Sequence, residues 1–292
     1  MGQIVFVVGT SGTGKSYSWG SFNTDEIAVI NCEGKLPSCE KEKPAFKCKK
    51  VNTDRSSDIV DKLKELSKRY KSIIIDDFQS VMTNENMRRA LEKGYDKWIE
   101  MAKNVWDIME SIKALPDDII VYILCHTDIS DDGREKIKTQ GKMIDNCIVL
   151  ESKASIVLKT GVQDGKYFFT TQNNGKDTVK SPAGMFSTYA INNDLKYVDE
   201  KIRNYYELGE LYLSDSEIAE IDEINKNLEI EPPKSRSERK QRKSREQVQA
   251  DNSSKVAYAG IEESGDAEEV PFEEVETPKV ETTPRRRRVR TE

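Results

Sequence analysis

A glycine-rich loop directly follows a short apolar run at the start of the chain. Residues 4–8 read Ile-Val-Phe-Val-Val, and residues 9–16 read Gly-Thr-Ser-Gly-Thr-Gly-Lys-Ser, a complete G-x-x-x-x-G-K-[ST] pattern. Glycines let the backbone curl until successive N–H groups face one anion, and a following helix would add its positive N-terminal end. The pattern therefore predicts a strand, a phosphate-binding loop and a helix in that order.

The residue types in this loop predict how a nucleoside triphosphate is held. The lysine reaches the β- and γ-phosphates, and the hydroxyl of the next residue ligates Mg²⁺. The predicted nucleotide-binding residues are Gly9, Thr10, Ser11, Gly12, Thr13, Gly14, Lys15, Ser16 and Tyr17. An ordinary glycine-rich turn is the alternative, and the apolar run before the loop argues against it. The sequence contains no motif that distinguishes ATP from GTP.

Composition divides the chain near residue 230. Hydrophobic residues make up 36% of the chain and charged residues 34%, which is too polar for one compact globule throughout. Like charges cluster at residues 234–245, 262–276 and Arg285–Arg288, where aromatic residues are few, so we expect residues 231–292 to be disordered. The net charge of −6 neither indicates nor excludes a nucleic-acid partner.

The sequence shows no targeting or membrane segment. There is no run of about 18 apolar residues, and the chain begins directly in the apolar run. We therefore expect a cytoplasmic protein with reduced thiols and no membrane partner. Cys32, Cys39 and Cys48 lie close together but form no C-x-x-C pair, and His126 is distant, so ordinary thiols are favoured over a zinc site.

Apolar runs alternate with helical patterns over the first 125 residues. The predicted strands are residues 4–8, 27–30, 73–75 and 119–124, and the helical patterns are residues 59–70 and 98–112. Continuous apolar strands interleaved with helices favour an α/β fold, with a mostly parallel central sheet covered by helices on both faces.

The pattern changes after residue 151. Residues 154–160 and 166–171 flank an Asp-Gly pair, which predicts an antiparallel β-hairpin that extends the sheet. Helical patterning returns at 199–208 and again at 214–228, where Ser214 and Glu217 form a capping box. We divide the chain into a core of residues 1–200, a helical segment of residues 201–230 and a charged tail of residues 231–292.

Acidic side chains follow two of the predicted strands. Asp76 and Asp77 end the run at 73–75, where an aspartate of a nucleotide-binding sheet holds Mg²⁺, so the predicted metal residues are Ser16, Asp76 and Asp77. Glu33 follows the strand at 27–30 and is our candidate for the base that polarises the attacking water. An exposed loop glutamate is the alternative for Glu33.

The single histidine of the chain, His126, ends the fourth predicted strand. The carboxyl ends of parallel strands are where an open α/β sheet binds its ligands, so His126 is a candidate sensor of the γ-phosphate. A structural histidine is an equally open interpretation. The sequence alone thus predicts three catalytic residues at the strand ends: Lys15, Glu33 and His126.

The order of these motifs resembles that of phage-encoded RecA-like P-loop ATPases, commonly described as nucleotide-binding AAA proteins and including the Sak-type single-strand annealing group. The resemblance extends over about residues 1–200, including Asp76-Asp77-Phe78-Gln79, residues 87–90, 93–98 and 175–186. It implies a RecA-like fold and hydrolysis of ATP with Mg²⁺ in a bacterial host cytoplasm. It also implies a homo-oligomer that acts with single-stranded DNA, with a phage single-strand-binding protein or a helicase as a further partner.

In RecA-like assemblies a basic residue of one subunit often completes the neighbouring ATP site. By this resemblance Lys176 and Lys180 are candidates, and we include Lys180 among the predicted catalytic residues. Both are lysines where an arginine is expected, and a lysine offers a point charge instead of a bidentate fork. Ordinary solvated lysines are the alternative.

Two segments are candidates for contact with single-stranded DNA. The first combines Arg88, Arg89, Lys93 and Lys97 with the rings of Tyr95 and Trp98, since stacking and cations hold such strands. Trp98 fits the helical face and is more easily explained as a core residue. The second is the segment 127–144, which carries Lys136, Lys138 and Lys142.

The tail and the function leave alternatives open. Residues 267–272 resemble the acidic Pro-Phe tip of bacterial single-strand-binding proteins, and an acidic linker is the simpler interpretation. The basic blocks at 234–245 and Arg285–Arg288 offer charges to a phosphate backbone.

The leading function is an ATPase of phage recombination or replication. The alternatives are a nucleotide-gated assembly or loading protein with little turnover, and a helicase loader or packaging component.

Overall fold

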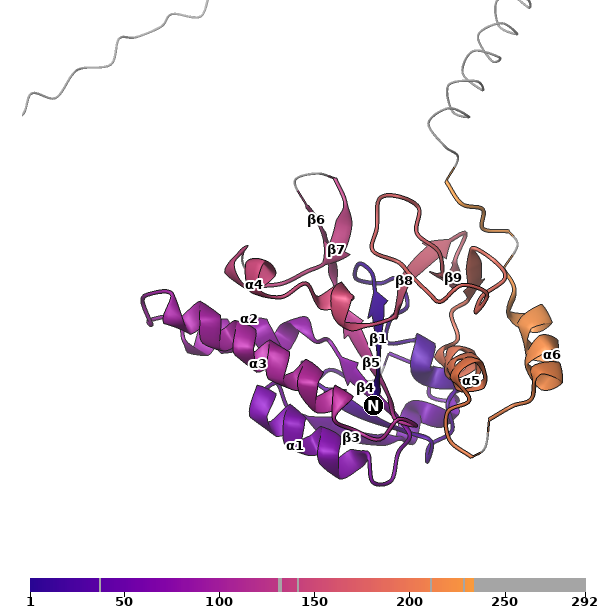
Figure 1. The fold of residues 1–292 in the computed structure, drawn as a ribbon, viewed down its shortest axis with the longest axis horizontal. Coiled ribbons are helices and arrows are strands. Elements are labelled where there is room, and N and C mark those ends of the chain that lie inside the picture. Colours follow the sequence, from indigo (N-terminus) through magenta and orange to yellow (C-terminus); the bar gives the residue numbers. More distant parts are fainter. Residues whose placement is uncertain (37, 131–132, 141, 211, 228, 234–292) are drawn as a thin grey trace, which may run out of the picture. The chain divides into compact units, whose positions relative to one another are not determined.

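The computed structural model describes residues 1–36, 38–130, 133–140, 142–210, 212–227 and 229–233 (Figure 1). Residues 1–233 form one compact unit. The tail predicted to be disordered lies outside the described residues from residue 234 onward, together with its basic blocks and the Pro-Phe segment. In the part of the chain that is described, no helix is both long and apolar enough to cross a membrane.

An eight-stranded sheet forms the centre of this unit, in the order β10-β9-β8-β1-β5-β4-β2-β3. Its strands are β1 (Gln3–Val8), β2 (Ile27–Asn31), β3 (Lys49–Asn52), β4 (Ser72–Asp76), β5 (Ile120–Cys125), β8 (Ile156–Gln163), β9 (Lys166–Thr170) and β10 (Ala190–Asn192). The strands from β8 to β3 are parallel, whereas β9 and β10 are antiparallel to their neighbours. The predicted mostly parallel sheet is confirmed.

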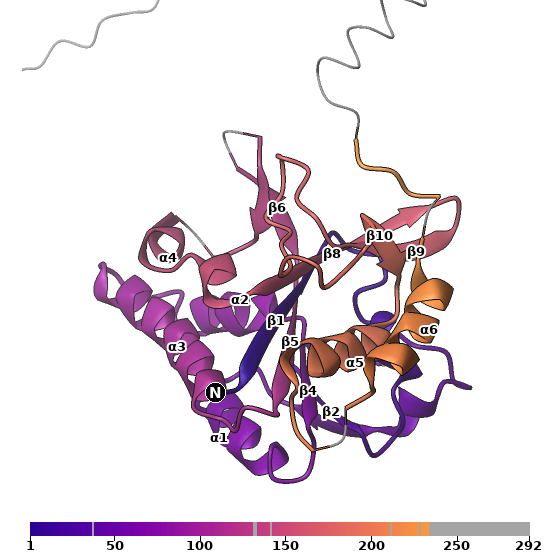
Figure 2. The same ribbon diagram turned by 45° about the vertical axis from the view of Figure 1, so that its right-hand side comes forward.

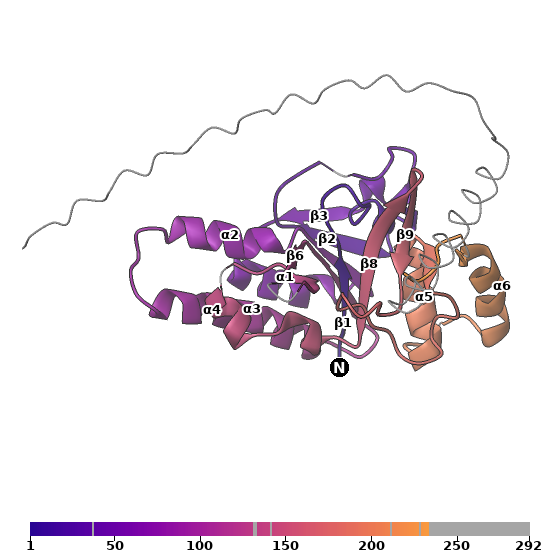
Figure 3. The same ribbon diagram turned by 90° about the horizontal axis from the view of Figure 1, so that it is seen from above.

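Helices cover both faces of the sheet, as predicted (Figure 3). The α-helices are α1 (Ser56–Leu66), α2 (Gln79–Arg88), α3 (Asp96–Lys113), α4 (Lys142–Cys147), α5 (Leu195–Tyr206) and α6 (Asp215–Asn225), and the 3-10 helices are η1 (Ser18–Ser21), η2 (Pro44–Lys47) and η3 (Leu150–Lys153). The capping box that starts α6 at Ser214 is confirmed, because its side chain and that of Glu217 bond each other's backbone N–H groups.

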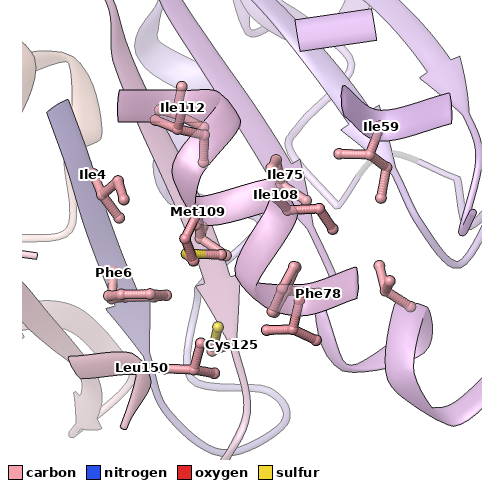
Figure 4. Packing of buried hydrophobic residues seen from close by; sticks show 14 of the residues in the cluster. Ile4, Phe6, Ile59, Ile75, Phe78, Ile108, Met109, Ile112, Cys125 and Leu150 are labelled. Carbon is pink, nitrogen blue, oxygen red and sulfur yellow. The ribbon is translucent and has the colours of Figure 1, made fainter. Parts of the chain in front are cut away.

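Alternate side chains of the strands supply two hydrophobic clusters, one on each face of the sheet. Ile4 and Phe6 of β1 belong to the first cluster, with Met109 and Ile112 of α3 (Figure 4). Val5 and Val7 belong to the second cluster, together with Trp19 of η1 and with α5. Because β-strand side chains alternate between faces, a strand that is apolar at every position is buried on both sides.

A buried charge network fixes α5 to the amino ends of β4 and β5. Asp199 accepts hydrogen bonds from Ser72 Oγ at 2.6 Å, from Tyr122 Oη at 2.9 Å and from Arg203 Nε at 2.7 Å. Asp199 is only 4% exposed, so each of these donors offsets the cost of removing its charge from water. The domain boundary predicted at residue 200 therefore falls inside a helix that is packed on the sheet.

The helix predicted directly after the glycine-rich loop is not formed, and this expectation was wrong. Only the short 3-10 helix η1 occupies this position, and β2 begins at Ile27. Trp19 and Phe22 are each 1% exposed and pack into the second hydrophobic cluster, which anchors this segment to the core. No long helix therefore begins directly after the loop, between Tyr17 and Ile27.

The predicted hairpin is confirmed by β8 and β9. Asp164 and Gly165 form its two-residue turn with φ of 51° and 77°, the positive values that a type I′ turn requires. A second hairpin, for which the sequence predicted no strands, lies within the segment 127–144 and pairs β6 (Thr127–Ile129) with β7 (Glu135–Ile137). It extends beyond the carboxyl end of β5 (Figure 2).

Candidate nucleotide-binding site

A cavity of about 320 Å³ opens beside the glycine-rich loop. The loop leaves the carboxyl end of β1, which lies between β8 and β5 in the sheet. The residues that line the cavity come from the loop and from four other segments: Ser11, Gly12, Gly14, Lys15, Ser16, Tyr17, Lys35, Ser38, Asp77, His126 and Tyr167. The structure thus brings the predicted loop residues together with Asp77 and His126.

At two glycines of the loop, an added side chain would collide with the β8–β9 hairpin unless a neighbour moved. A Cβ at Gly9 would lie 2.2 Å from Thr160 Oγ1, and a Cβ at Gly14 would lie 2.8 Å from Cδ1 of Tyr167. Gly14 also has a φ of 93°, a conformation that residues with a side chain rarely adopt. The β8–β9 hairpin therefore packs directly on the loop, and the two glycines make that approach possible.

The ammonium group of Lys15 is held by the loop itself. Its Nζ donates hydrogen bonds to the carbonyl oxygens of Gly9 and Thr10, each at 2.8 Å. The Lys15 side chain is buried, and this desolvation lowers its pKa, against the attraction of the Asp77 and Asp76 carboxylates. The lysine is therefore already placed over the loop where a phosphate oxygen would replace a carbonyl as its partner.

Ser16 and Asp76 form the pair that the sequence predicted for Mg²⁺. Ser16 Oγ donates a hydrogen bond to Asp76 Oδ1 at 2.9 Å. Burial raises the pKa of Asp76, and the hydrogen bond from Ser16 acts in the opposite direction. A hydroxyl and a carboxylate are hard oxygen donors of the kind that Mg²⁺ prefers, so the residues present fit this ion.

The carboxylate of Asp77 contacts two side chains, the imidazole of His126 and the ammonium group of Lys35. Its Oδ1 accepts a hydrogen bond from Nε2 of His126 at 3.0 Å, and its Oδ2 lies 2.6 Å from Nζ of Lys35. The hydrogen bond with His126 and then the pairing with Lys35 hold the pKa of Asp77 well below its usual range, despite partial burial. With both oxygens engaged in this way, the role of Asp77 as a second Mg²⁺ ligand stays a prediction.

Hydrogen bonds hold both the ring and the backbone of His126. Nε2 faces the Asp77 carboxylate, which accepts hydrogen bonds, and Nδ1 lies 3.4 Å from the ammonium of Lys15, which donates them. The backbone N–H of His126 donates to Oε1 of Gln79 at 2.8 Å, and its carbonyl accepts from the N–H of Lys138 at 2.8 Å. His126 therefore joins the loop lysine to the segment that follows β7.

Glu33 lies close to the site but is turned to another partner. Its carboxylate accepts a hydrogen bond from Ser80 in the first turn of α2, and the residue is exposed. Among the described residues, Glu33 is not one of those that line the cavity around Lys15. Its role as the base that activates water stays a prediction.

Lys35 is a cavity residue that sequence reasoning missed. It follows β2 in the same loop as Glu33, and its side chain is 63% exposed while its ammonium pairs with Asp77. The signal in the sequence was its position two residues after Glu33, in a loop at the carboxyl end of a strand. Only the strand order, with β2 next to β4, shows that this loop reaches Asp77.

Lys176 and Lys180, the candidates for completing a neighbouring site, lie elsewhere. The backbone of Lys180 bridges Val157 of β8, with N–H···O distances of 2.8 Å and 3.0 Å. Lys176 is exposed, and its carbonyl accepts a hydrogen bond from the N–H of Glu135 at 2.7 Å. Neither lysine lines the cavity of its own chain, and their action on another subunit stays a prediction.

The first candidate segment for DNA has most of its cations already paired. Arg88 pairs with Asp54 at 2.6 Å, and Arg89 pairs with Glu85, Glu92 and Glu100. Lys97 is 7% exposed and donates to the carbonyl oxygen of Arg89 at 2.8 Å. Trp98 packs against the first hydrophobic cluster, which confirms the core interpretation. Lys93 and Tyr95 remain exposed.

The second candidate segment adjoins the nucleotide site. Lys136 pairs with Asp145 at 2.6 Å, and Lys142 begins α4. Lys138 lines a cavity of about 290 Å³ that also contacts Thr10 and Ser11 of the loop, Gln79 and His126. His126 and the loop thus border both cavities.

The three neighbouring cysteines do not converge. Cys32 belongs to the first hydrophobic cluster, whereas Cys39 and Cys48 belong to the second. Burial raises the pKa of all three thiols, which keeps them protonated. Each of them contributes to packing as a small apolar residue.

Comparison with known proteins identifies the domain. No curated protein matches the chain. A family model described as an AAA domain matches residues 1–181, which include the glycine-rich loop, Asp76 and His126. The parallel sheet, the loop at the end of β1 and the Ser16–Asp76 pair agree with that match, because they are the parts that a P-loop ATPase uses to bind a nucleotide. The chain therefore belongs to the AAA domain family.

Proposed function

We propose that the chain hydrolyses ATP with Mg²⁺ and acts with single-stranded DNA as an accessory protein of phage recombination or replication. The observation that carries the ATPase proposal is that Lys15, Ser16 and the Asp77–His126 pair line one cavity, while Asp76 lies behind them as the hydrogen-bond partner of Ser16. These groups supply the cation, the metal ligands and the γ-phosphate contact that phosphoryl transfer needs.

Binding begins with an exchange of partners in the loop. The ammonium of Lys15 leaves the carbonyl oxygens of Gly9 and Thr10 for the β- and γ-phosphates, while loop N–H groups bond the phosphate oxygens. Ser16 and Asp76 would hold Mg²⁺, and the ion would supply positive charge against the negative charge that develops during transfer. His126, held by Asp77 and Gln79, stands beside Lys15 at the γ-phosphate end.

Hydrolysis requires a base, and Glu33 is our candidate. Its carboxylate would leave Ser80 and accept a proton from water while the water oxygen bonds the γ-phosphorus. The bond between that phosphorus and the β–γ bridging oxygen then breaks, so that ADP and inorganic phosphate leave and Glu33 returns the proton to solvent. Lys35 adds positive charge near the leaving phosphate oxygens when it moves away from Asp77.

We propose the segment after β5, and not the region of Arg88 and Arg89, as the DNA contact. The carbonyl of His126 bonds the backbone of Lys138, so a shift of His126 on the γ-phosphate moves this segment directly. Gln79 strengthens the link, since it bonds the backbone of His126 and also donates to the carbonyl of Lys138 at 3.0 Å. A homo-oligomer, with a phage single-strand-binding protein or a helicase as partner in the bacterial cytoplasm, completes this proposal.

The experiment is ATP hydrolysis measured with and without single-stranded DNA, with Lys15→Ala as the inactive control. Stimulation by DNA that Lys138→Ala removes, and that Lys93→Ala retains, supports the proposal. If DNA neither binds nor changes the rate, the DNA proposal is wrong. The ATPase proposal is tested separately by the rate without DNA, which must exceed that of Lys15→Ala.

A nucleotide-gated assembly or loading protein is the second candidate function. The observation that favours it is the position of Glu33, which bonds Ser80 instead of lining the cavity. A base held away from the γ-phosphate would allow tight binding with little turnover. Nucleotide-dependent assembly, together with hydrolysis no faster than that of Lys15→Ala, would favour this function over the first.

A further inference from the structure

Two tyrosine rings lie together at one side of the nucleotide cavity. Tyr17 directly follows the glycine-rich loop, and Tyr167 is the second residue of β9. Their ring centroids are 5.6 Å apart and their planes are inclined by 32°. Both residues line the cavity, and Tyr167 is 40% exposed. The pair therefore presents aromatic surface to whatever enters the cavity.

The lining of the cavity is divided by the order of the strands. The polar residues Lys35, Asp77 and His126 follow β2, β4 and β5, which all lie on one side of β1. Tyr167 is on β9, which lies on the other side of β1, beyond β8. The loop at the end of β1 stands between the ionic side and the aromatic side. A nucleoside triphosphate has the same two parts, a polyanion at one end and a planar π-system at the other.

The position of Tyr167 is set by the sheet. Val162 of β8 pairs with Tyr167 across the hairpin, and β8 pairs in parallel with β1, so that Lys159 lies opposite Val8 at the start of the loop. The ring rests against Gly14, where a Cβ would approach within 2.8 Å of it. A stacking surface that is already fixed in this way loses little conformational entropy when a ligand binds.

An unpaired amide, that of Asn193, lies beside Gly14 in the same part of the site. The side-chain nitrogen and oxygen of Asn193 are both shielded from solvent, and neither has a hydrogen-bond partner in the described part of the chain. A Cβ at Gly14 would lie 3.3 Å from this nitrogen, which places the amide beside the loop and Tyr167. A buried donor and acceptor without partners are destabilising, so this corner of the site is not optimised for the stability of the free protein.

We propose that Tyr17 and Tyr167 form the nucleobase subsite, against which the base of the bound triphosphate stacks. The proposal rests on nucleotide binding as described under the proposed function. It assigns the γ-phosphate to the side of His126 and the base to the side of β9. Stacking accepts any base because every base has a π-face, and the larger face of a purine gives purine triphosphates the higher affinity.

The test compares two ligands that share phosphates and differ in the base. Binding of ATP and of inorganic tripolyphosphate, each with Mg²⁺, is measured by calorimetry on the full chain. The variants are Tyr167→Ala, Tyr167→Phe and, as matched control, Tyr205→Ala. Tyr205 is also 40% exposed and also pairs with a second tyrosine, Tyr206, with ring centroids 5.0 Å apart, but it lies on α5 away from this cavity.

We expect Tyr167→Ala to raise the Kd for ATP about 10- to 100-fold and to leave the Kd for tripolyphosphate unchanged. Tyr167→Phe retains the affinity for ATP because it keeps the ring, and Tyr205→Ala retains both affinities. An equal loss of both ligands in Tyr167→Ala, or an unchanged affinity for ATP, overturns the proposal. If the unaltered chain binds neither ligand, the proposed nucleotide binding itself fails, which is a different result from either of these.

Discussion

Lys35 and Asp77 form an ion pair across the nucleotide cavity, with Nζ of the lysine 2.6 Å from Oδ2 of the aspartate. Asp77 holds His126 with its other oxygen, and the lysine comes from the loop after β2. The pair raises the pKa of Lys35, chiefly through its hydrogen bond with Asp77, and keeps the side chain charged. One carboxylate therefore holds in place two other residues that line the cavity, Lys35 and His126.

The first prediction concerns the source of the cation that assists hydrolysis. If Lys35 supplies it within the same chain, Lys35→Ala lowers kcat for ATP about 100-fold, a typical cost of losing one group that stabilises transition-state charge. Lys35→Arg, which keeps the charge, retains part of the rate. The controls are Lys176→Ala and Lys180→Ala. A large loss in either control with little loss in Lys35→Ala would place the assisting cation on a neighbouring subunit.

The second prediction concerns acid stability. The folded carboxyl of Asp77 has a lowered pKa, so it binds a proton less readily than the same group in the unfolded chain. As pH falls below about 4, the unfolded state takes up the proton first and stability is lost. The stability advantage of the unaltered chain over Asp77→Asn is therefore fully present above about pH 5 and shrinks as pH falls further. Denaturant unfolding from pH 7 to pH 3 measures it. A difference that is constant across this range would contradict the assignment.

The third prediction separates backbone strain from contact in the loop. Gly12 and Gly14 both have positive φ, of 79° and 93°, so Gly12→Ala and Gly14→Ala suffer comparable strain. Only the Cβ of Gly14→Ala meets Tyr167, since nothing lies within 4 Å of a Cβ at Gly12. We expect Gly14→Ala to weaken ATP binding at least about tenfold more than Gly12→Ala does, because the added methyl group displaces the ring or the loop. Titration with ATP measures both, and equal losses would show that strain alone decides.

The fourth prediction concerns a part of the fold away from the nucleotide. Arg203→Leu removes the charge partner of the buried Asp199 and leaves that carboxylate with Ser72 and Tyr122 alone. The free energy of unfolding should fall by about 3 kcal/mol, as is usual when one member of a buried pair is lost. The affinity for ATP should stay the same, because Arg203 contacts Lys71 and Asp118, which precede β4 and β5, whereas the cavity lies at the carboxyl ends of the strands. Lys226→Leu, which removes the partner of the exposed Glu223, is the control with a small effect.

Much of the fold follows from the local pattern of the sequence. The strands β1, β2, β4 and β5 are apolar at nearly every position, and such runs are stable only when both faces of the sheet are covered. The strand β3 escaped prediction because Lys49-Lys50-Val51-Asn52 is polar, as an edge strand needs to be. The helix expected after the loop was wrong: the chain forms only the short 3-10 helix η1 there, and Trp19 and Phe22 are buried in the second hydrophobic cluster.

The sequence by itself determined the elements that the motif requires: the loop, its lysine and serine, and the acidic strand end at Asp76. Their roles depend on residue type and local spacing, and adjacent parallel strands bring their carboxyl ends together in any such sheet. Tertiary structure alone decided which partners these groups have. Lys35 reaches Asp77 because β2 lies beside β4, and Tyr167 reaches Gly14 because β8 and β9 lie on the far side of β1. The order of strands in a sheet is set by the packing of the whole core, so no local pattern in the chain records it.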